Sequence, residues 1–212
     1  MTGSNSNVVI ALPSRRYRRA GEVLGRAFLD DPLWRATFPD ADERPGLLTG
    51  MFTGAVKATA AAQGMVETTP GVDAVALWLP PGKDIGFWAM ARSGFALPRF
   101  TMSLPAKDRN RMMAVLRQLE ERRKALMPDP HWYLTTIGVE PEHQGEGLGS
   151  TLLRSGIRRA DHEDTSIFLD TETSGNVSFY QHFGFEVIEE TIAPASGVPV
   201  WLMVRRSASP PM

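Results

Sequence analysis

A run of closely spaced glycines between a predicted strand and a predicted helix constrains this chain more than any other feature. The segment from Ile137 to Ser150 reads IGVEPEHQGEGLGS, and its last three glycines are Gly145, Gly147 and Gly149. Such a turn aims several backbone N–H groups, together with the positive end of the helix dipole, at one point in space. Glycine also tolerates positive φ and lets an anion approach the amides closely. The segment therefore predicts a site for a phosphate or pyrophosphate.

The residues of this turn narrow its ligand class. A turn that merely ends a strand is the simplest alternative, but three alternating glycines lose much backbone entropy on folding. The loop that binds ATP or GTP requires a Lys, which this turn lacks. The dinucleotide turn G-x-G-x-x-G is nearly matched by Gly145, Gly147 and Ser150, with Asp170 placed to bind a ribose. Two observations count against a dinucleotide: Ser150 replaces the third glycine, and the chain after Asp170 is too short for a dinucleotide domain. An NAD(P)-dependent oxidoreductase is therefore kept as the alternative, and acyl-coenzyme A is the third class of ligand.

Two motifs favour acyl-coenzyme A. The segment Gln144–Gly149, QGEGLG, resembles the [QR]-x-x-G-x-[GA] pyrophosphate loop of the GNAT superfamily of N-acetyltransferases, and Val139–Pro141 resembles the strand exit that precedes it. The segment Asn176–Phe185, NVSFYQHFGF, is similar to the Asn…Tyr-x-x-x-Gly-Phe segment of that family. The resemblance covers Trp132 to Glu190 well, and it implies an acetyl-CoA-dependent N-acetyltransferase that acts on the primary amine of a small molecule.

One branch of the superfamily shows the strongest likeness. Asn176 and Tyr180 are four residues apart, whereas the commonest form of the family has seven. This spacing, the strand HWYLTTIGV and the phrase FLDT at 168–171 look most like the branch that contains puromycin N-acetyltransferase. That likeness suggests an antibiotic-like or other nucleoside or aminated metabolite as the acceptor.

The resemblance also implies where acetyl-CoA binds. Its pantetheine arm is expected to lie like an extra strand beside the splayed end of the strand that leads into the turn. Backbone N–H groups near Ile137, Gly138 and Val139 would then stabilise the thioester oxygen as it becomes an oxyanion. The predicted cofactor-binding residues are Ile137, Gly138, Val139, Gln144, Gly145, Glu146, Gly147, Leu148, Gly149, Ser150, Asn176 and Tyr180.

Acetyl transfer to an amine needs a general acid for the departing thiolate and a general base for the amine proton. Tyr180 matches the family tyrosine that points at the thioester sulfur, and helical spacing places it on the same face as Asn176. Asp170, at a strand end, is the predicted base, with Glu140 and Glu172 as alternatives. The simpler interpretations are that Tyr180 packs a short helix on the sheet and that Asp170 is a cap or loop residue.

The absence of cysteine bears on the mechanism. With Cys 0, no cysteine acyl-enzyme forms, and direct attack of the amine in a ternary complex is the expected route. The four histidines, at 131, 143, 162 and 182, have no metal-ligand spacing, so no metal is assigned. The aromatic residues that we interpret as an acceptor pocket, with core packing as the simpler alternative, are Trp34, Trp78, Trp132 and Tyr133.

The predicted strands and helices, taken together with the resemblance, imply an α+β (α/β) fold in a single acetyltransferase domain over 1–206, with a disordered tail at 207–212. The resemblance also implies a mixed, mostly antiparallel, twisted sheet of about six to seven strands, splayed at the cofactor strand and flanked by helices. A helical insertion at 85–127, of unassigned role, precedes the cofactor strand. The expected strands are 8–10, 65–68, 74–79, 131–139, 166–170, 185–190 and 199–205, and the expected helices are 15–29, 45–63, 85–96, 106–127, 147–160 and 176–182.

Composition and charge set the remaining expectations. A net charge of −1 gives no general field for nucleic acid or an anionic membrane, and the basic group at 15–19 is expected to be a solvated helix face. No stretch reaches the roughly 18 uncharged apolar residues of a membrane span, and the polar start of the chain lacks a signal-peptide pattern. A cytoplasmic enzyme with a small amine partner is therefore expected, as monomer or homodimer. A non-catalytic module that binds acyl-CoA is the other alternative.

Overall fold

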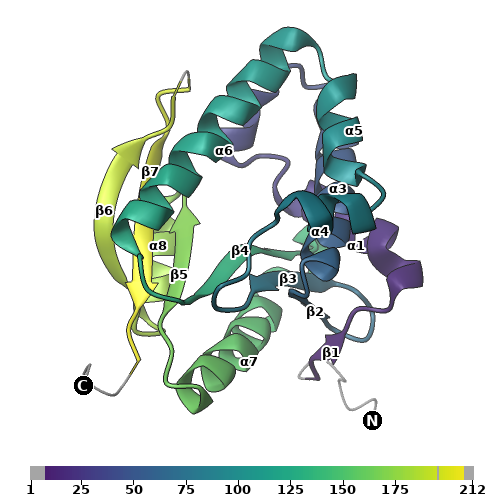
Figure 1. Ribbon diagram of the computed structural model, residues 1–212. Helices are drawn as coiled ribbons and strands as arrows, with labels where there is room; N and C mark the ends of the chain where they lie inside the picture. Colours follow the sequence, from purple (N-terminus) through teal and green to yellow (C-terminus); the bar gives the residue numbers. More distant parts are fainter. Residues whose placement is uncertain (1–7, 195, 208–212) are drawn as a thin grey trace.

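One seven-stranded sheet runs through the part of the protein that the computed structural model describes, residues 8–194 and 196–207 (Figure 1). Every pairing between neighbouring strands is antiparallel except that of β4 with β5. The mixed, mostly antiparallel sheet that the sequence predicts is thereby confirmed. In spatial order the strands are β1 (Ile10–Ala11), β2 (Met65–Thr68), β3 (Ala74–Leu79), β4 (Trp132–Val139), β5 (Ile167–Thr171), β7 (Pro199–Arg205) and β6 (Glu186–Ile192).

Strands β4 and β5 separate soon after they meet. Their parallel pairing is confined to Trp132 with Ile167 and Tyr133 with Phe168, whereas β4 pairs with β3 as far as Val139. In Figure 1 the two strands diverge from this point. Among the described residues, no strand therefore lies beside β4 beyond Tyr133 on the β5 side, and the backbone groups of that edge are open to a ligand.

Helices cover both faces of the sheet, and β3 is therefore buried on both sides. Its side chains alternate between two cores: Val75 and Leu77 pack with the helices that precede β2, and Trp78 packs with the helix that follows β4. The first group is η2 (Ser14–Arg16), α1 (Tyr17–Ala27), α2 (Pro32–Thr37) and α3 (Arg44–Ala61). The second face carries α7 (Leu148–His162), which η3 (Pro141–His143) precedes.

Helix α2 was not expected from the sequence. It lies between the expected helices at 15–29 and 45–63, where the Asp31 carboxylate accepts hydrogen bonds from the backbone N–H groups of Leu33 (2.9 Å) and Trp34 (3.2 Å). An aspartate cap followed by proline in the first turn starts a helix as readily as it stops one. The same residues therefore separate α1 from α2.

The segment at 85–127 forms three helices instead of the expected two. They are α4 (Phe87–Arg92), α5 (Ala96–Ser103) and α6 (Ala106–Leu126), and α8 (Ser174–Gln181) follows later in the chain. The single helix expected at 85–96 is wrong because Gly94 and Phe95 both take positive φ, at 69° and 53°, and break it. Figure 1 shows α6 running across the sheet, after which the chain leads into β4.

The buried face of α6 includes a cation. Met112, Val115 and Leu119 are buried, whereas Leu116 is 43% exposed. Arg123 is only 7% exposed. Because Arg123 lies four residues after Leu119, it continues the same helical stripe, and the pattern itself contains this signal.

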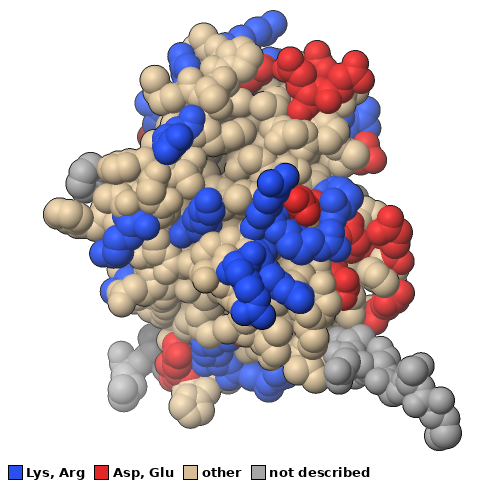
Figure 2. Space-filling model, turned by 90° about the vertical axis from the view of Figure 1, so that its right-hand side faces the viewer, with Lys and Arg blue, Asp and Glu red and all other residues tan. Residues whose placement is uncertain are grey.

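Most of the predicted elements are confirmed with shifts of a few residues at their ends, and the strands at 65–68, 74–79 and 199–205 have the predicted bounds. The basic group on η2 and α1 is solvated as expected, with Arg15, Arg16 and Arg18 exposed. Figure 2 shows Lys and Arg side chains gathered on the face of the molecule that these elements occupy. Of the tail expected at 207–212, all but Ser207 lies outside the described residues.

Candidate active site

The glycine turn joins β4 to α7 with two residues in the left-handed region. Gly145 has a φ of 85° and Gly147, the N-cap residue of α7, a φ of 81°, so both positions favour glycine. In the part of the chain that the structure describes, no side chain caps α7, which leaves its first backbone N–H groups available. The side chain of Gln144 donates to the Val139 carbonyl at 3.3 Å, and Glu146 contacts His143. The turn therefore presents backbone amides rather than charged side chains to an anion.

Glu140, one of the alternative bases, is held in an ion-pair cluster at the end of β4. It is 3% exposed, and it accepts from both nitrogens of the Arg26 fork, one of them at 2.7 Å, and from Arg19 at 3.1 Å. The Arg26 hydrogen bond holds the pKa of Glu140 below its ordinary value. Such a carboxylate is a weak proton acceptor, and its position instead ties α1 to the start of the glycine turn.

A cavity of about 980 Å³ opens where β4 and β5 diverge. The predicted residues Ile137, Asn176 and Tyr180 line it together with Asp170, and so do Trp34 and Tyr133. Most of the remaining walls are aromatic and aliphatic side chains of α2 to α6 and of Phe28, which directly follows α1. Trp78 and Trp132 are not among its lining residues. They are 0% and 4% exposed and lie in the core beneath α7, so packing, the simpler interpretation, describes them.

A bulge in β4 lies at the point of divergence. Leu77 pairs with Thr136 and Trp78 with Leu134, so Thr135 is the extra residue between them. Bulges redirect the backbone and are common beside active sites. Thr135 and its neighbour Thr136 both line the cavity. The alternating pattern of the sequence did not reveal this bulge, which lies two residues before the backbone amides that we expected to bind the thioester.

Tyr180 lies one helical turn after Asn176 on α8. It is 7% exposed, and its ring packs against that of Phe185 at a centroid distance of 5.7 Å. Burial, with a smaller effect of the Glu172 and Asp170 carboxylates, raises the pKa of Tyr180 above its ordinary value. The phenol therefore keeps its proton at neutral pH and is available as a proton donor.

Three carboxyl groups gather near the end of β5. Burial raises the pKa of Asp170 to about 6, although a hydrogen bond from the Tyr133 hydroxyl at 2.8 Å and the charge of Arg123 oppose this. Burial also raises the pKa of Asp31 to about 6. The pKa of Glu172 is raised further, because burial is joined by repulsion from Asp31 and Asp170. Asp170 is thus ionised at neutral pH, yet more basic than an ordinary carboxylate.

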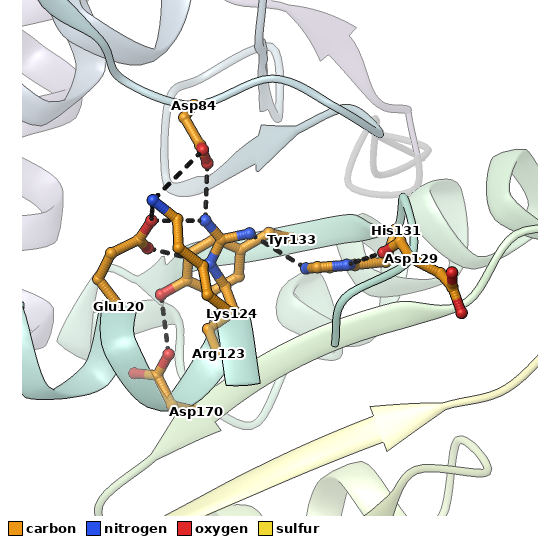
Figure 3. A network of polar contacts seen from close by, with 8 residues as sticks. All are labelled: Asp84, Glu120, Arg123, Lys124, Asp129, His131, Tyr133 and Asp170. Carbon is orange, nitrogen blue, oxygen red and sulfur yellow. Dashed lines mark hydrogen bonds and ion pairs between the residues drawn. The ribbon is translucent and has the colours of Figure 1, made fainter. Parts of the chain in front are cut away.

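Figure 3 shows a cluster of polar contacts around Arg123, near the end of α6, that the sequence analysis did not predict. Arg123 donates to Asp84 at 2.6 Å and to Glu120 at 2.8 Å, and its guanidinium lies over the Tyr133 ring at 5.0 Å from the centroid. Within the described residues, no group of three or more His, Asp or Glu side chains is placed to hold a metal ion. None of the described helices is long and apolar enough to cross a membrane.

The splayed sheet, the glycine turn and the cavity beside β4 are those of an enzyme of the acyltransferase class. The sequence model of the acetyltransferase (GNAT) family matches residues 77–185, and the chain belongs to this family. An uncharacterized N-acetyltransferase of Schizosaccharomyces pombe is 27% identical over 200 residues, which cover 91% of this chain and 80% of that protein. A mycothiol acetyltransferase of Kocuria rhizophila is 36% identical over 53 residues, which cover 24% of this chain and 18% of that protein.

Solved structures share the fold. One described as a histone acetyltransferase HPA2 and related acetyltransferase from Corynebacterium glutamicum has a TM-score of 0.69 and 22% identity, with 97% of this chain and 98% of that chain covered. A polyamine N-acetyltransferase of Drosophila melanogaster has a TM-score of 0.59 and 15% identity, with 94% and 99% covered. Family membership explains the glycine turn without a dinucleotide. The likeness to the puromycin N-acetyltransferase branch stays a prediction.

Proposed function

We propose that this protein transfers the acetyl group of acetyl-CoA to the primary amine of a small molecule by direct attack in a ternary complex. The observation that carries the proposal is the divergence of β4 and β5, which opens one edge of β4 and brings Asp170 and Tyr180 to the same cavity. The glycine turn ends that same strand. A donor bound along β4 would therefore have its phosphates at the turn and its thioester in the cavity.

The fit to acetyl-CoA rests on backbone groups. The amides of the Gly145–Gly149 turn and the start of α7 would hold the pyrophosphate, and the open edge of β4 would pair with the pantetheine amides. Asn176 would bind the same arm from α8. When bound, acetyl-CoA supplies the activated acyl group. The apolar walls of the cavity and the carboxyl groups at its end favour an acceptor amine with an apolar body.

Asp170 and Tyr180 divide the proton transfers between them. Asp170 accepts the proton that the amine nitrogen loses as its bond to the acyl carbon forms, and its pKa of about 6 suits that role at neutral pH. Tyr180 donates its phenol proton to the sulfur as the carbon–sulfur bond breaks, and solvent returns the proton from Asp170 to Tyr180. Glu172 is less suited as the base, because burial and repulsion from Asp31 and Asp170 raise its pKa well above the ordinary value and so disfavour its ionised form.

An assay of coenzyme A release tests the proposal. The protein contains no Cys, so a thiol reagent reports only the released coenzyme A. We expect release that depends on an amine, in a panel containing an arylalkylamine, agmatine and puromycin, with intersecting lines in two-substrate kinetics. Parallel lines would exclude direct attack. Calorimetric binding of acetyl-CoA without release for any amine would instead indicate the non-catalytic acyl-CoA-binding module.

A further inference from the structure

Arg123 joins the two ends of the helical segment that leaves the sheet after β3 and returns at β4. Its guanidinium binds Asp84, which lies just before the segment, while Arg123 itself lies near the end of α6. Glu120 accepts from the same guanidinium at 2.8 Å and 3.0 Å. Although both acids are partly exposed, the Arg123 side chain is only 8% exposed. The buried guanidinium of Arg123 therefore holds the beginning and the end of the segment together.

The same cation also contacts β4. Its central carbon lies 5.0 Å from the centroid of the Tyr133 ring, and another nitrogen lies 3.1 Å from Nε2 of His131. The hydroxyl of Tyr133 in turn donates to Asp170 at 2.8 Å. Figure 3 shows this continuous path, with Arg123 beside the ring of Tyr133 and Asp170 at its hydroxyl. The ring of Tyr133 thus connects Arg123, which holds the two ends of the segment, to the Asp170 carboxylate.

We propose that Arg123 and Tyr133 are positioning residues, which hold the Asp170 carboxyl at the cavity in the orientation that accepts the amine proton. This inference rests on the proposed function, in which Asp170 is the base. Tyr133 fixes one carboxylate oxygen and leaves the other for the acceptor. Arg123 fixes the ring of Tyr133 by stacking on it and by anchoring it to the closed segment.

Charged and titratable groups reach Asp170 from four elements. Tyr133 faces it from β4, Arg123 from α6, Tyr180 from α8 and Glu172 from the end of β5. Farther out, Glu120 acts on Tyr133, and Asp31 acts on Glu172. The Tyr133 hydrogen bond and the Arg123 charge lower the pKa of Asp170, against the larger effect of burial. Loss of either group should therefore raise this pKa further above about 6.

Lys124 provides a matched control for Arg123. It pairs with Glu120 at 2.9 Å and with Asp84 at 3.9 Å, the same two acids, but its side chain is 61% exposed, and within the described residues its ion pairs are with these two acids alone. Lys124→Met thus removes a neighbouring cation from the same acids without removing a contact to the ring. A change in the titration of Asp170 that occurs in Arg123→Met and not in Lys124→Met is therefore attributed to the contact between Arg123 and Tyr133.

The direct test is a titration of Asp170 by NMR in full-length protein with ¹³C-labelled aspartate carboxyls, in which Asp170→Asn identifies the signal. We expect Arg123→Met and Tyr133→Phe each to raise the midpoint by roughly one pH unit, and the double variant to raise it by less than the sum. Lys124→Met should titrate like the wild type. An unchanged midpoint in Arg123→Met, or an equal change in Lys124→Met, would overturn the proposal.

Kinetics separate this inference from the proposed function. The acidic limb of kcat/KM should move upward with the NMR midpoint in Arg123→Met, while KM for acetyl-CoA stays within about twofold. Full activity in Asp170→Asn would overturn the assignment of the base, whereas an inactive Asp170→Asn with a normal titration in Arg123→Met would overturn the positioning role alone. If Arg123→Met does not fold, Arg123→Lys, which keeps the charge without the planar group, should shift the midpoint by a smaller amount; no shift would again overturn it.

Discussion

Gly156 of α7 lies directly against the indole of Trp78 in β3. A Cβ atom at Gly156 would lie 2.2 Å from Cζ2 and 2.3 Å from Cη2 of that ring, distances that no real contact allows. Trp78 is fully buried, so any shift of its ring would disturb the core around it. The absence of a side chain at Gly156 therefore sets how closely α7 packs on the sheet, and so places the glycine turn at the start of α7 beside the end of β4.

Gly156→Ala should destabilise the protein by about 1 to 3 kcal/mol, because overpacking forces the helix or the ring to shift. Urea denaturation measures the change. Trp78→Phe removes the ring atoms that would clash, so the double variant should be less destabilised than the sum of the two single variants. Gly46→Ala is the control, since no atom lies within 4 Å of its Cβ position in α3, and it should not be destabilising. Additive losses in the double variant would contradict the packing argument.

Gly147→Ala should weaken acetyl-CoA binding by at least about tenfold. An alanine at a φ of 81° costs roughly 1 to 2 kcal/mol, and relief of that strain turns the amides at the start of α7 away from the phosphates. Isothermal titration calorimetry measures the dissociation constant. Gly197→Ala imposes similar strain at a φ of 70° in the connection between β6 and β7, away from the turn. It should lower stability and leave acetyl-CoA binding unchanged, and equal weakening by both variants would argue against a site at the glycine turn.

Local signals in the sequence predicted the glycine turn and most of the strands. Glycines and alternating apolar residues determine backbone conformation over a few neighbours, and Gly147 and β3 behave accordingly. Asp170 and Tyr180 came from motifs and strand ends, and both line the cavity. Such signals carry no information on the distance between two strands. The two-residue pairing of β4 with β5, which opens the cavity, depends on how the whole sheet packs.

The missed residues have partners far away in the chain. Asp84 lies 39 residues before Arg123, and the burial of this arginine depends on that contact and on Tyr133 of another element. A single sequence records the helical stripe on which Arg123 falls, but it does not show that a cation occupies a buried position. Asp31 was not among the predicted site residues, because its approach to Glu172 arises from the fold.

Asp170→Asn should lower kcat by about 10² or more while stabilising the protein at pH 8. The loss of activity follows from removal of the base. The folded-state pKa of about 6 exceeds the ordinary value of 3.8, so the free energy of unfolding of the wild type falls as pH rises from about 4 to 6. Asparagine removes this decrease and still accepts a hydrogen bond from Tyr133, which gives a gain of up to about 3 kcal/mol at pH 8. Urea denaturation at pH 5 and pH 8 measures it. A variant less stable at pH 8 than the wild type would contradict the buried-charge argument.

Tyr180→Phe should lower kcat by roughly 10² with little change in KM for acetyl-CoA, because the proton donor is lost while the ring that packs against Phe185 remains. The pKa of Tyr180 is raised by burial, so the alkaline limb of the wild-type profile should not depend on this phenol and should persist in the variant at the pH of the wild type. Steady-state release of coenzyme A between pH 5 and 10 measures both effects.

Tyr17→Phe is the matched control for Tyr180→Phe. Tyr17 packs with the core formed by α1 and α3, and it is not among the residues that line the cavity. Loss of its hydroxyl should leave kcat within about twofold. If Tyr180→Phe keeps wild-type kcat with every accepted amine, Tyr180 is not the acid. A further prediction follows if departure of the thiolate limits kcat in Tyr180→Phe. Acetyl donors whose thiols are more acidic than coenzyme A should then show a smaller loss of kcat in this variant than acetyl-CoA, because a better leaving group needs less protonation at sulfur.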